Sequence, residues 1–238
     1  CIYWFNRKIL ITIMILHLFY KEWIKTRWAF LGALIIGICI VFYIFIMVEN
    51  RMTMLGAKNY TLSVLYDNPP VIYYSLLQYI PLLTAICIGI SQYIPEVKNK
   101  RIRLTLHLPM NNQKLIACMA LFGLLLITVS NGIIFVLFEW KNQLLFPAEV
   151  TRPVTVTIIN WFIASYLAYN YIAMTALEPN GYRQLLYAIT GLILLSLYFN
   201  NINFHGAYKD SAPVLAIIAL VSCPLVLFSG YRLNKGER

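Results

Sequence analysis

The chain has 238 residues, of which 61% are hydrophobic and only 12% are charged, and its formal net charge is +10. A soluble domain carries roughly 25% charged residues, so this composition excludes an ordinary water-covered surface and predicts an integral membrane protein. The basic residues lie between apolar runs, so we attribute the positive charge to the topology of a membrane protein and expect no nucleic-acid partner.

The first 27 residues are expected to form a cytoplasmic segment that contains an interfacial amphipathic helix. Within Leu16–Trp28, helical spacing places apolar side chains on one arc and polar ones on the opposite arc. The polar arc holds His17, Lys21, Glu22 and Lys25. Alternatively, the apolar run Ile9–Phe19 belongs to a further membrane span. No small-residue cleavage site follows this run, so we expect no cleavable signal peptide.

Six long apolar segments follow, and none of them contains Asp, Glu, Lys, Arg or His. Segments of this kind predict membrane-spanning helices, because a span needs about 20 apolar residues. They are Trp28–Val48, Val71–Tyr93, Leu115–Phe138, Val154–Ala176, Leu185–Phe199 and Pro213–Tyr231. The predicted fold is an all-α integral membrane protein with a six-helix domain over 28–231 and a short tail over 232–238. Within the second span, Pro81 is expected to kink the helix.

The connections between these spans differ in charge. Segments 1–27, 94–114, 177–184 and 232–238 hold 14 of the 19 Lys and Arg residues, whereas the three other connections hold five. Cytoplasmic connections carry the excess of basic residues, so both termini are predicted to be cytoplasmic. The predicted location is the plasma membrane, and specifically the bacterial inner membrane.

The sequence lacks the residue patterns that several kinds of catalytic, metal-binding and nucleotide-binding site require. The three histidines, His17, His107 and His205, lie outside the spans, and there is no HExxH motif and no P-loop. Four of the five cysteines lie in apolar runs, where they are expected to pack as small hydrophobic residues. We therefore expect no catalytic site, no metal site and no cofactor, and no binding of ATP through a P-loop of this chain.

The second cytoplasmic connection, residues 95–114, is the most distinctive segment. It combines one acidic residue, five basic residues and the apolar residues Ile102, Leu104, Leu106 and Leu108. Their strict alternation favours a strand, but no second strand is predicted nearby, so we expect a short amphipathic helix at the interface. A simpler interpretation is a solvated basic loop beside anionic lipid head groups.

The order of elements along the chain is an entry helix with Tyr20–Lys25, a span, an outer loop and a second span. The connection after this second span begins with Glu96 and ends in Leu108-Pro109. In these features the chain resembles the permease subunit of a type 2 ATP-binding-cassette (ABC) exporter, and the resemblance covers the whole chain in topology. Ile102-Arg103 stands where the family commonly has Gly-Thr.

The resemblance implies a permease without an ATPase domain, paired with a second permease copy or a homologue and with separate ATPase subunits. The residues implied to contact the ATPase are Glu96, Arg101, Arg103, Leu104, Leu106 and Leu108. Two other functions remain open from the residues alone: a non-catalytic assembly or scaffold subunit, and a small secondary transporter. The sequence does not predict a substrate.

Small and polar residues within the spans have two interpretations. Ala29, Ala33 and Gly37 recur every four residues, a spacing that lets helices approach closely. This pattern is typical of a dimer interface and equally of packing within one chain, and the resemblance favours the dimer interface. Amide side chains inside the predicted spans could either line a translocation path or form hydrogen bonds between helices. They are Gln78, Gln92, Asn131, Asn160 and Asn170.

Overall fold

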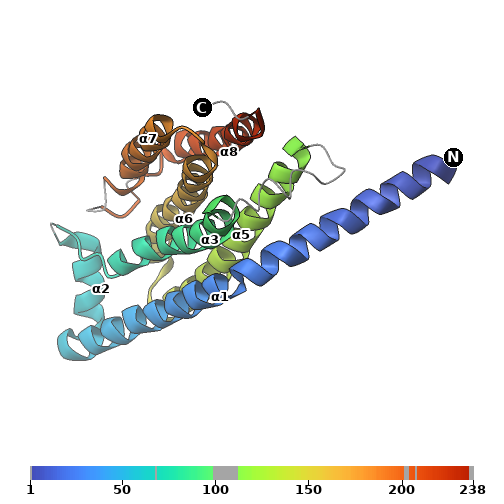
Figure 1. Cartoon of the computed structure of the whole chain (residues 1–238). Coiled ribbons are helices and arrows are strands. Elements are labelled where there is room, and N and C mark those ends of the chain that lie inside the picture. Colours follow the sequence, from blue (N-terminus) through green and yellow to red (C-terminus); the bar gives the residue numbers. More distant parts are fainter. Residues whose placement is uncertain (1, 68, 99–111, 201–203, 207, 236–238) are drawn as a thin grey trace.

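The computed structural model is a bundle of long helices (Figure 1). It describes residues 2–67, 69–98, 112–200, 204–206 and 208–235, and these contain helices and connections but no strand. The helices are α1 (Ile2–Leu55), α2 (Ala57–Tyr66), the 3-10 helix η1 (Ser75–Gln78), α3 (Tyr79–Lys98), α5 (Asn112–Leu145), α6 (Ala148–Leu177), α7 (Gly181–Phe199) and α8 (Ala212–Lys235). The all-helical prediction is confirmed for this part of the chain.

Five segments are long and apolar enough to cross a membrane. They lie in α1, in η1 with α3, and in α5, α7 and α8. Large apolar side chains are exposed along these helices, for example Ile46 on α1, Leu121 on α5, Leu192 on α7 and Leu220 on α8. Such a surface is suited to lipid and would be costly in water.

The predicted span Val154–Ala176 lies in α6, which is not among these five. Polar residues such as Asn160, Tyr169 and Asn170 recur along it and lower its hydropathy. It nevertheless packs against α3, α5, α7 and α8, and all three of these side chains are buried. The polar side chains of α6 therefore face other helices of this chain, and whether α6 crosses a membrane stays a prediction.

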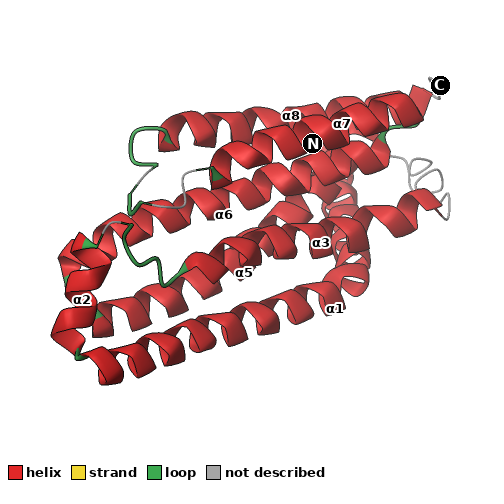
Figure 2. Ribbon diagram, turned by 90° about the vertical axis from the view of Figure 1, so that its left-hand side faces the viewer, coloured by secondary structure: helices red, strands yellow, loops and turns green. Residues whose placement is uncertain are grey.

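The predicted interfacial helix is not a separate element. Residues 16–28 contain no Pro or Gly that would end a helix, and α1 runs through them without interruption. Figures 1 and 2 show that α1 is bent and that its first part runs across the direction shared by the other helices. Within α1, the Thr26 hydroxyl donates a hydrogen bond to the Glu22 carbonyl oxygen at 2.9 Å, and bonds of this type favour bending.

The ends of the helices differ from the predicted ends where a helix continues past the apolar run. α3 extends to Lys98 and α5 to Leu145, and only Phe146 and Pro147 separate α5 from α6. Helix α2 occupies part of the connection between the first two predicted spans, where no helix was predicted. The predicted kink at Pro81 is wrong, because Pro81 lies in the first turn of α3, where its missing N–H costs no hydrogen bond.

Figure 2 shows α2 at one end of the bundle and the C-terminal end of α8 at the other. The ends of α3 and α6 and the start of α7 lie at the same end as the C-terminal end of α8. These are the helix ends that flank the predicted cytoplasmic connections. The helices therefore alternate in direction as the predicted topology requires.

Candidate functional site

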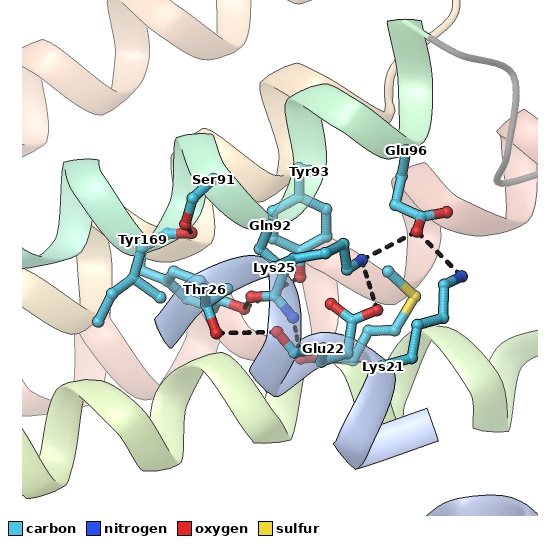
Figure 3. A network of polar contacts seen from close by, with 11 residues as sticks. Lys21, Glu22, Lys25, Thr26, Ser91, Gln92, Tyr93, Glu96 and Tyr169 are labelled. Carbon is cyan, nitrogen blue, oxygen red and sulfur yellow. Dashed lines mark hydrogen bonds and ion pairs between the residues drawn. The ribbon is translucent and has the colours of Figure 1, made fainter. Parts of the chain in front are cut away.

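Four charged side chains meet inside the bundle at this end (Figure 3). The Lys25 ammonium lies 2.6 Å from Glu22 Oε1 and 2.9 Å from Glu96 Oε1, and the Lys21 ammonium lies 2.9 Å from the same Glu96 oxygen. Lys21, Glu22 and Lys25 come from the first part of α1, and Glu96 comes from the last turn of α3. We call these four residues the charge cluster.

The charge cluster is buried at its carboxylates and open to solvent at its lysines. The side chains of Glu22 and Glu96 are 0% and 1% exposed, whereas those of Lys25 and Lys21 are 14% and 40% exposed. Two acids and two bases balance in charge, which is the condition under which buried ions are tolerated. Leu16 and Tyr20, on the apolar arc of the same part of α1, point outward and are 66% and 65% exposed. Glu22 therefore faces the protein, and not water as an interfacial helix would require.

A network of neutral polar groups lies next to the charge cluster. Gln92 of α3 donates to the backbone oxygen of Met119 at 2.7 Å and accepts from the Tyr169 hydroxyl at 2.7 Å. The hydroxyls of Tyr93 and Tyr169 lie 3.2 Å apart. These bonds connect α3 with α5 and α6, so the charge cluster and this network together join four helices.

A close approach of α6 to α5 makes this network possible. Gly123 on α5 lies directly against the Tyr169 hydroxyl, and a Cβ at this position would collide with it and with Gln92 Oε1. Gly123 is therefore required for its small size. The sequence offers no signal for this role, because glycine in a membrane helix has many uses.

The arrangement fixes the positions of helices relative to one another. Removing one partner from a buried ion pair typically costs about 3–5 kcal/mol, because it leaves a buried charge uncompensated. The charge cluster thus fixes the first part of α1 against the end of α3. One acceptor is not satisfied: Glu22 Oε2 is buried and has no hydrogen-bond partner among the described residues. Within the same residues, no group of three His, Cys, Asp or Glu side chains is placed to hold a metal ion.

Of the residues predicted to contact an ATPase, only Glu96 lies in the described part of the chain. It is fully buried, and its ion partners Lys21 and Lys25 come from this chain. The other five lie outside the described residues: Arg101, Arg103, Leu104, Leu106 and Leu108. Lys21 and Lys25 were predicted to lie on a polar arc, but their pairing with Glu96 was not predicted.

The small residues of α1 face the interior of this chain. Ala33 is 2% exposed, Gly37 is buried and Ala29 is half-buried. A Cβ at Gly37 would lie 2.6 Å from Ile134 Cδ1 of α5 and 3.0 Å from Ile80 Cγ2 of α3. This contact favours the packing interpretation for Gly37, while a dimer involving α1 stays a prediction.

Several of the amides in the predicted spans form hydrogen bonds between helices. Asn131 Nδ2 donates to Ser165 Oγ at 2.8 Å, and Asn170 Nδ2 donates to Ser222 Oγ at 2.8 Å. Asn131 thus links α5 to α6, and Asn170 links α6 to α8. Gln92 links α3 to α5. Asn160 instead bonds within α6, to the Val156 carbonyl oxygen at 3.0 Å.

Comparison with known proteins adds no assignment to this geometry. No protein-family model, no curated protein and no solved structure matches the chain.

Proposed function

We propose that the chain is the membrane permease subunit of an ABC transporter, an exporter driven by separate ATPase subunits. The observation that carries the proposal is the charge cluster. It joins the entry segment of α1 to Glu96, and Glu96 stands at the start of the cytoplasmic connection that resembles a coupling element. A loop that only sets the orientation of the chain in the membrane requires positive charge. It does not require a buried ion pair to another helix.

The charge cluster gives a route for mechanical coupling. Glu96 lies two residues before the end of α3, so a force on the connection 99–111 would enter the helix close to this carboxylate. Lys21 and Lys25 pass the force to α1, and the Gln92–Tyr169 bond passes it to α6. Closure of the ATPase subunits on the connection would then tilt α1 and α6 together.

The proposal places six helices across the bacterial inner membrane, with both termini in the cytoplasm. α6 adds a sixth span to the five candidate helices, and the helices around it shield its polar side chains from lipid. The 14 basic residues on the side of the termini support this orientation. A second permease copy, or a homologue, completes the transporter.

Co-purification of the ATPase tests the proposal. The tagged chain is purified from its native membrane, and nucleotide-binding polypeptides are identified by mass spectrometry. In the double variant Leu104→Ser/Leu106→Ser all five basic residues of the connection remain, so membrane insertion should be unchanged while the ATPase is lost. Each buried leucine contact removed weakens binding by about 1–3 kcal/mol.

The matched control is Leu62→Ser/Leu65→Ser on α2. These leucines are 44% and 38% exposed at the opposite end of the bundle, so the ATPase should still co-purify. If the ATPase remains bound to the Leu104→Ser/Leu106→Ser variant, or if the unmodified chain brings down none, the permease proposal fails. A scaffold subunit would then be the better interpretation.

A further inference from the structure

A groove of about 620 Å³ lies between α5 and α6, near the short connection that joins them. Its volume is within the range of small-molecule sites, which is about 300–1,000 Å³. The polar side chains that line it include Glu139 and Gln143 from α5 and Arg152 and Thr155 from α6, and Phe146 and Val156 add apolar surface. The groove lies at the end of the bundle opposite to the charge cluster.

An acid and a base line this groove without pairing with each other. Glu139 Oε1 accepts a hydrogen bond from Gln143 and Oε2 accepts one from Thr155, both at 3.1 Å. Each oxygen of a carboxylate can accept a second hydrogen bond. The Arg152 guanidinium makes no ion pair or hydrogen bond within the described part of the chain, so its five donors are free. The groove therefore presents acceptors at one side and donors at the other.

The surroundings indicate the depth of the groove in a membrane. Trp140, next to Glu139, is 56% exposed, and the Lys141 ammonium lies 5.8 Å from the centre of its ring. Exposed tryptophan is enriched at the level of lipid head groups, and lysine beside it reaches toward water. The groove thus lies where a lipid head group meets the first carbons of its acyl chains.

We propose that this groove binds the head group of a zwitterionic phospholipid that carries a primary amine. The ammonium donates hydrogen bonds to Glu139, and the phosphate accepts hydrogen bonds from Arg152 as a bidentate partner. Phe146 and Val156 contact the apolar part of the same lipid. A quaternary ammonium has no N–H to donate, so the site discriminates between phosphatidylethanolamine and phosphatidylcholine. This inference does not depend on the proposed transport function.

Native mass spectrometry of the purified full chain in detergent tests the site. The chain is titrated with phosphatidylethanolamine, phosphatidylcholine and phosphatidylglycerol of identical acyl chains, and with inorganic phosphate as competitor. We expect a one-to-one adduct with phosphatidylethanolamine at the lowest concentration. Arg152→Gln and Glu139→Gln should each weaken it about tenfold, the loss of one charge-assisted hydrogen bond.

Lys141→Gln is the matched control, because it removes a neighbouring charge that does not line the groove, and its adduct should be unchanged. Arg152→Lys keeps the charge but not the fork of donors, so its binding should be intermediate even if Arg152→Gln folds poorly. Equal adducts with all three lipids would overturn the proposal. Equal losses in Lys141→Gln and Arg152→Gln, or displacement of the lipid by inorganic phosphate, would overturn it too.

Discussion

Lys25 of α1 and Glu96 of α3 are 71 positions apart in the sequence, yet the Lys25 ammonium lies 2.9 Å from Glu96 Oε1. The Glu96 side chain is 1% exposed, so its charge depends on lysines for compensation. The pair ties the first part of α1 to the last turn of α3, directly before the connection that the proposed function assigns to the ATPase.

The first prediction concerns the stability of this pair. Glu96→Gln should lower the free energy of unfolding in mixed micelles by about 3 kcal/mol, because Lys25 and Lys21 then lose a buried partner. The double variant Lys25→Met/Glu96→Leu removes both charges. Its loss in the free energy of unfolding should be smaller than the sum of the losses in Lys25→Met and Glu96→Leu. Lys58→Gln on the exposed face of α2 is the control, with an effect within about 0.5 kcal/mol. Strict additivity in the double variant would show that the pair is not coupled.

The second prediction concerns helix packing at Gly37. Gly37→Leu should lower the free energy of unfolding by about 1–3 kcal/mol, because its Cβ would press on Ile134 and Ile80. Gly32→Leu on the same helix is the matched control, since an added Cβ there meets nothing within 4 Å. If Gly37→Leu leaves stability unchanged but abolishes a dimer in crosslinking, Gly37 serves the dimer and not the packing of this chain.

The third prediction concerns the orientation in the membrane. In a background with the five native cysteines replaced by alanine, a cysteine at Asn59 should react with an impermeant thiol reagent added outside intact cells. Asn59 is exposed on α2 at the end of the bundle predicted to be external. A cysteine at Gln113, at the start of α5, should react only after the membrane is permeabilised. The reverse pattern of labelling would invert the topology.

The fourth prediction concerns His205, which lies in the connection between α7 and α8. Its Nδ1 lies 2.9 Å from the Tyr74 hydroxyl and its Nε2 lies 3.1 Å from the Val64 carbonyl oxygen. Burial lowers the pKa of His205 below its usual 6.5, while the hydrogen bond to Val64 opposes this shift. As the pH falls below about 6.5, the unfolded chain binds the proton first, so stability that is fully present at higher pH is lost.

Thermal unfolding measured from pH 7.5 down to pH 5 therefore should show a falling midpoint in the unmodified chain and a smaller fall in His205→Gln. His17→Gln, at the other end of the bundle, is measured in parallel to show what the loss of an imidazole elsewhere does to stability. A His205→Gln variant with the full pH dependence would mean that other groups cause it.

Apolar composition marks a predicted span clearly where the helix exposes large apolar side chains, and more weakly where other helices enclose it. Runs such as Leu115–Phe138 contain no charged residue and expose large apolar side chains such as Leu121 and Leu125, so composition alone reveals them. α6 shows how this signal weakens, since a helix enclosed by others carries amides and tyrosines. Helix ends are displaced outward because residues such as Lys98 continue a helix after its apolar run has ended.

The candidate site was predictable only in part, because its geometry is tertiary. Glu96 stood out as an acid at the start of a basic connection, and Lys21, Glu22 and Lys25 stood out as one arc of a helix. Nothing in the local pattern indicated that these two features face each other. The Gln92–Tyr169 bond depends in addition on the small size of Gly123, for which no periodicity gives a signal.

The most direct test of the central claim asks which molecule touches the connection between α3 and α5. A photoreactive benzoylphenylalanine placed at Leu106 is irradiated in native membranes, and its adducts are identified by mass spectrometry, with the same residue at Leu62 of α2 as control. We predict an adduct at Leu106 with a polypeptide that carries a P-loop, and none of this kind at Leu62. Adducts of Leu106 with lipid or with this chain alone would contradict the account.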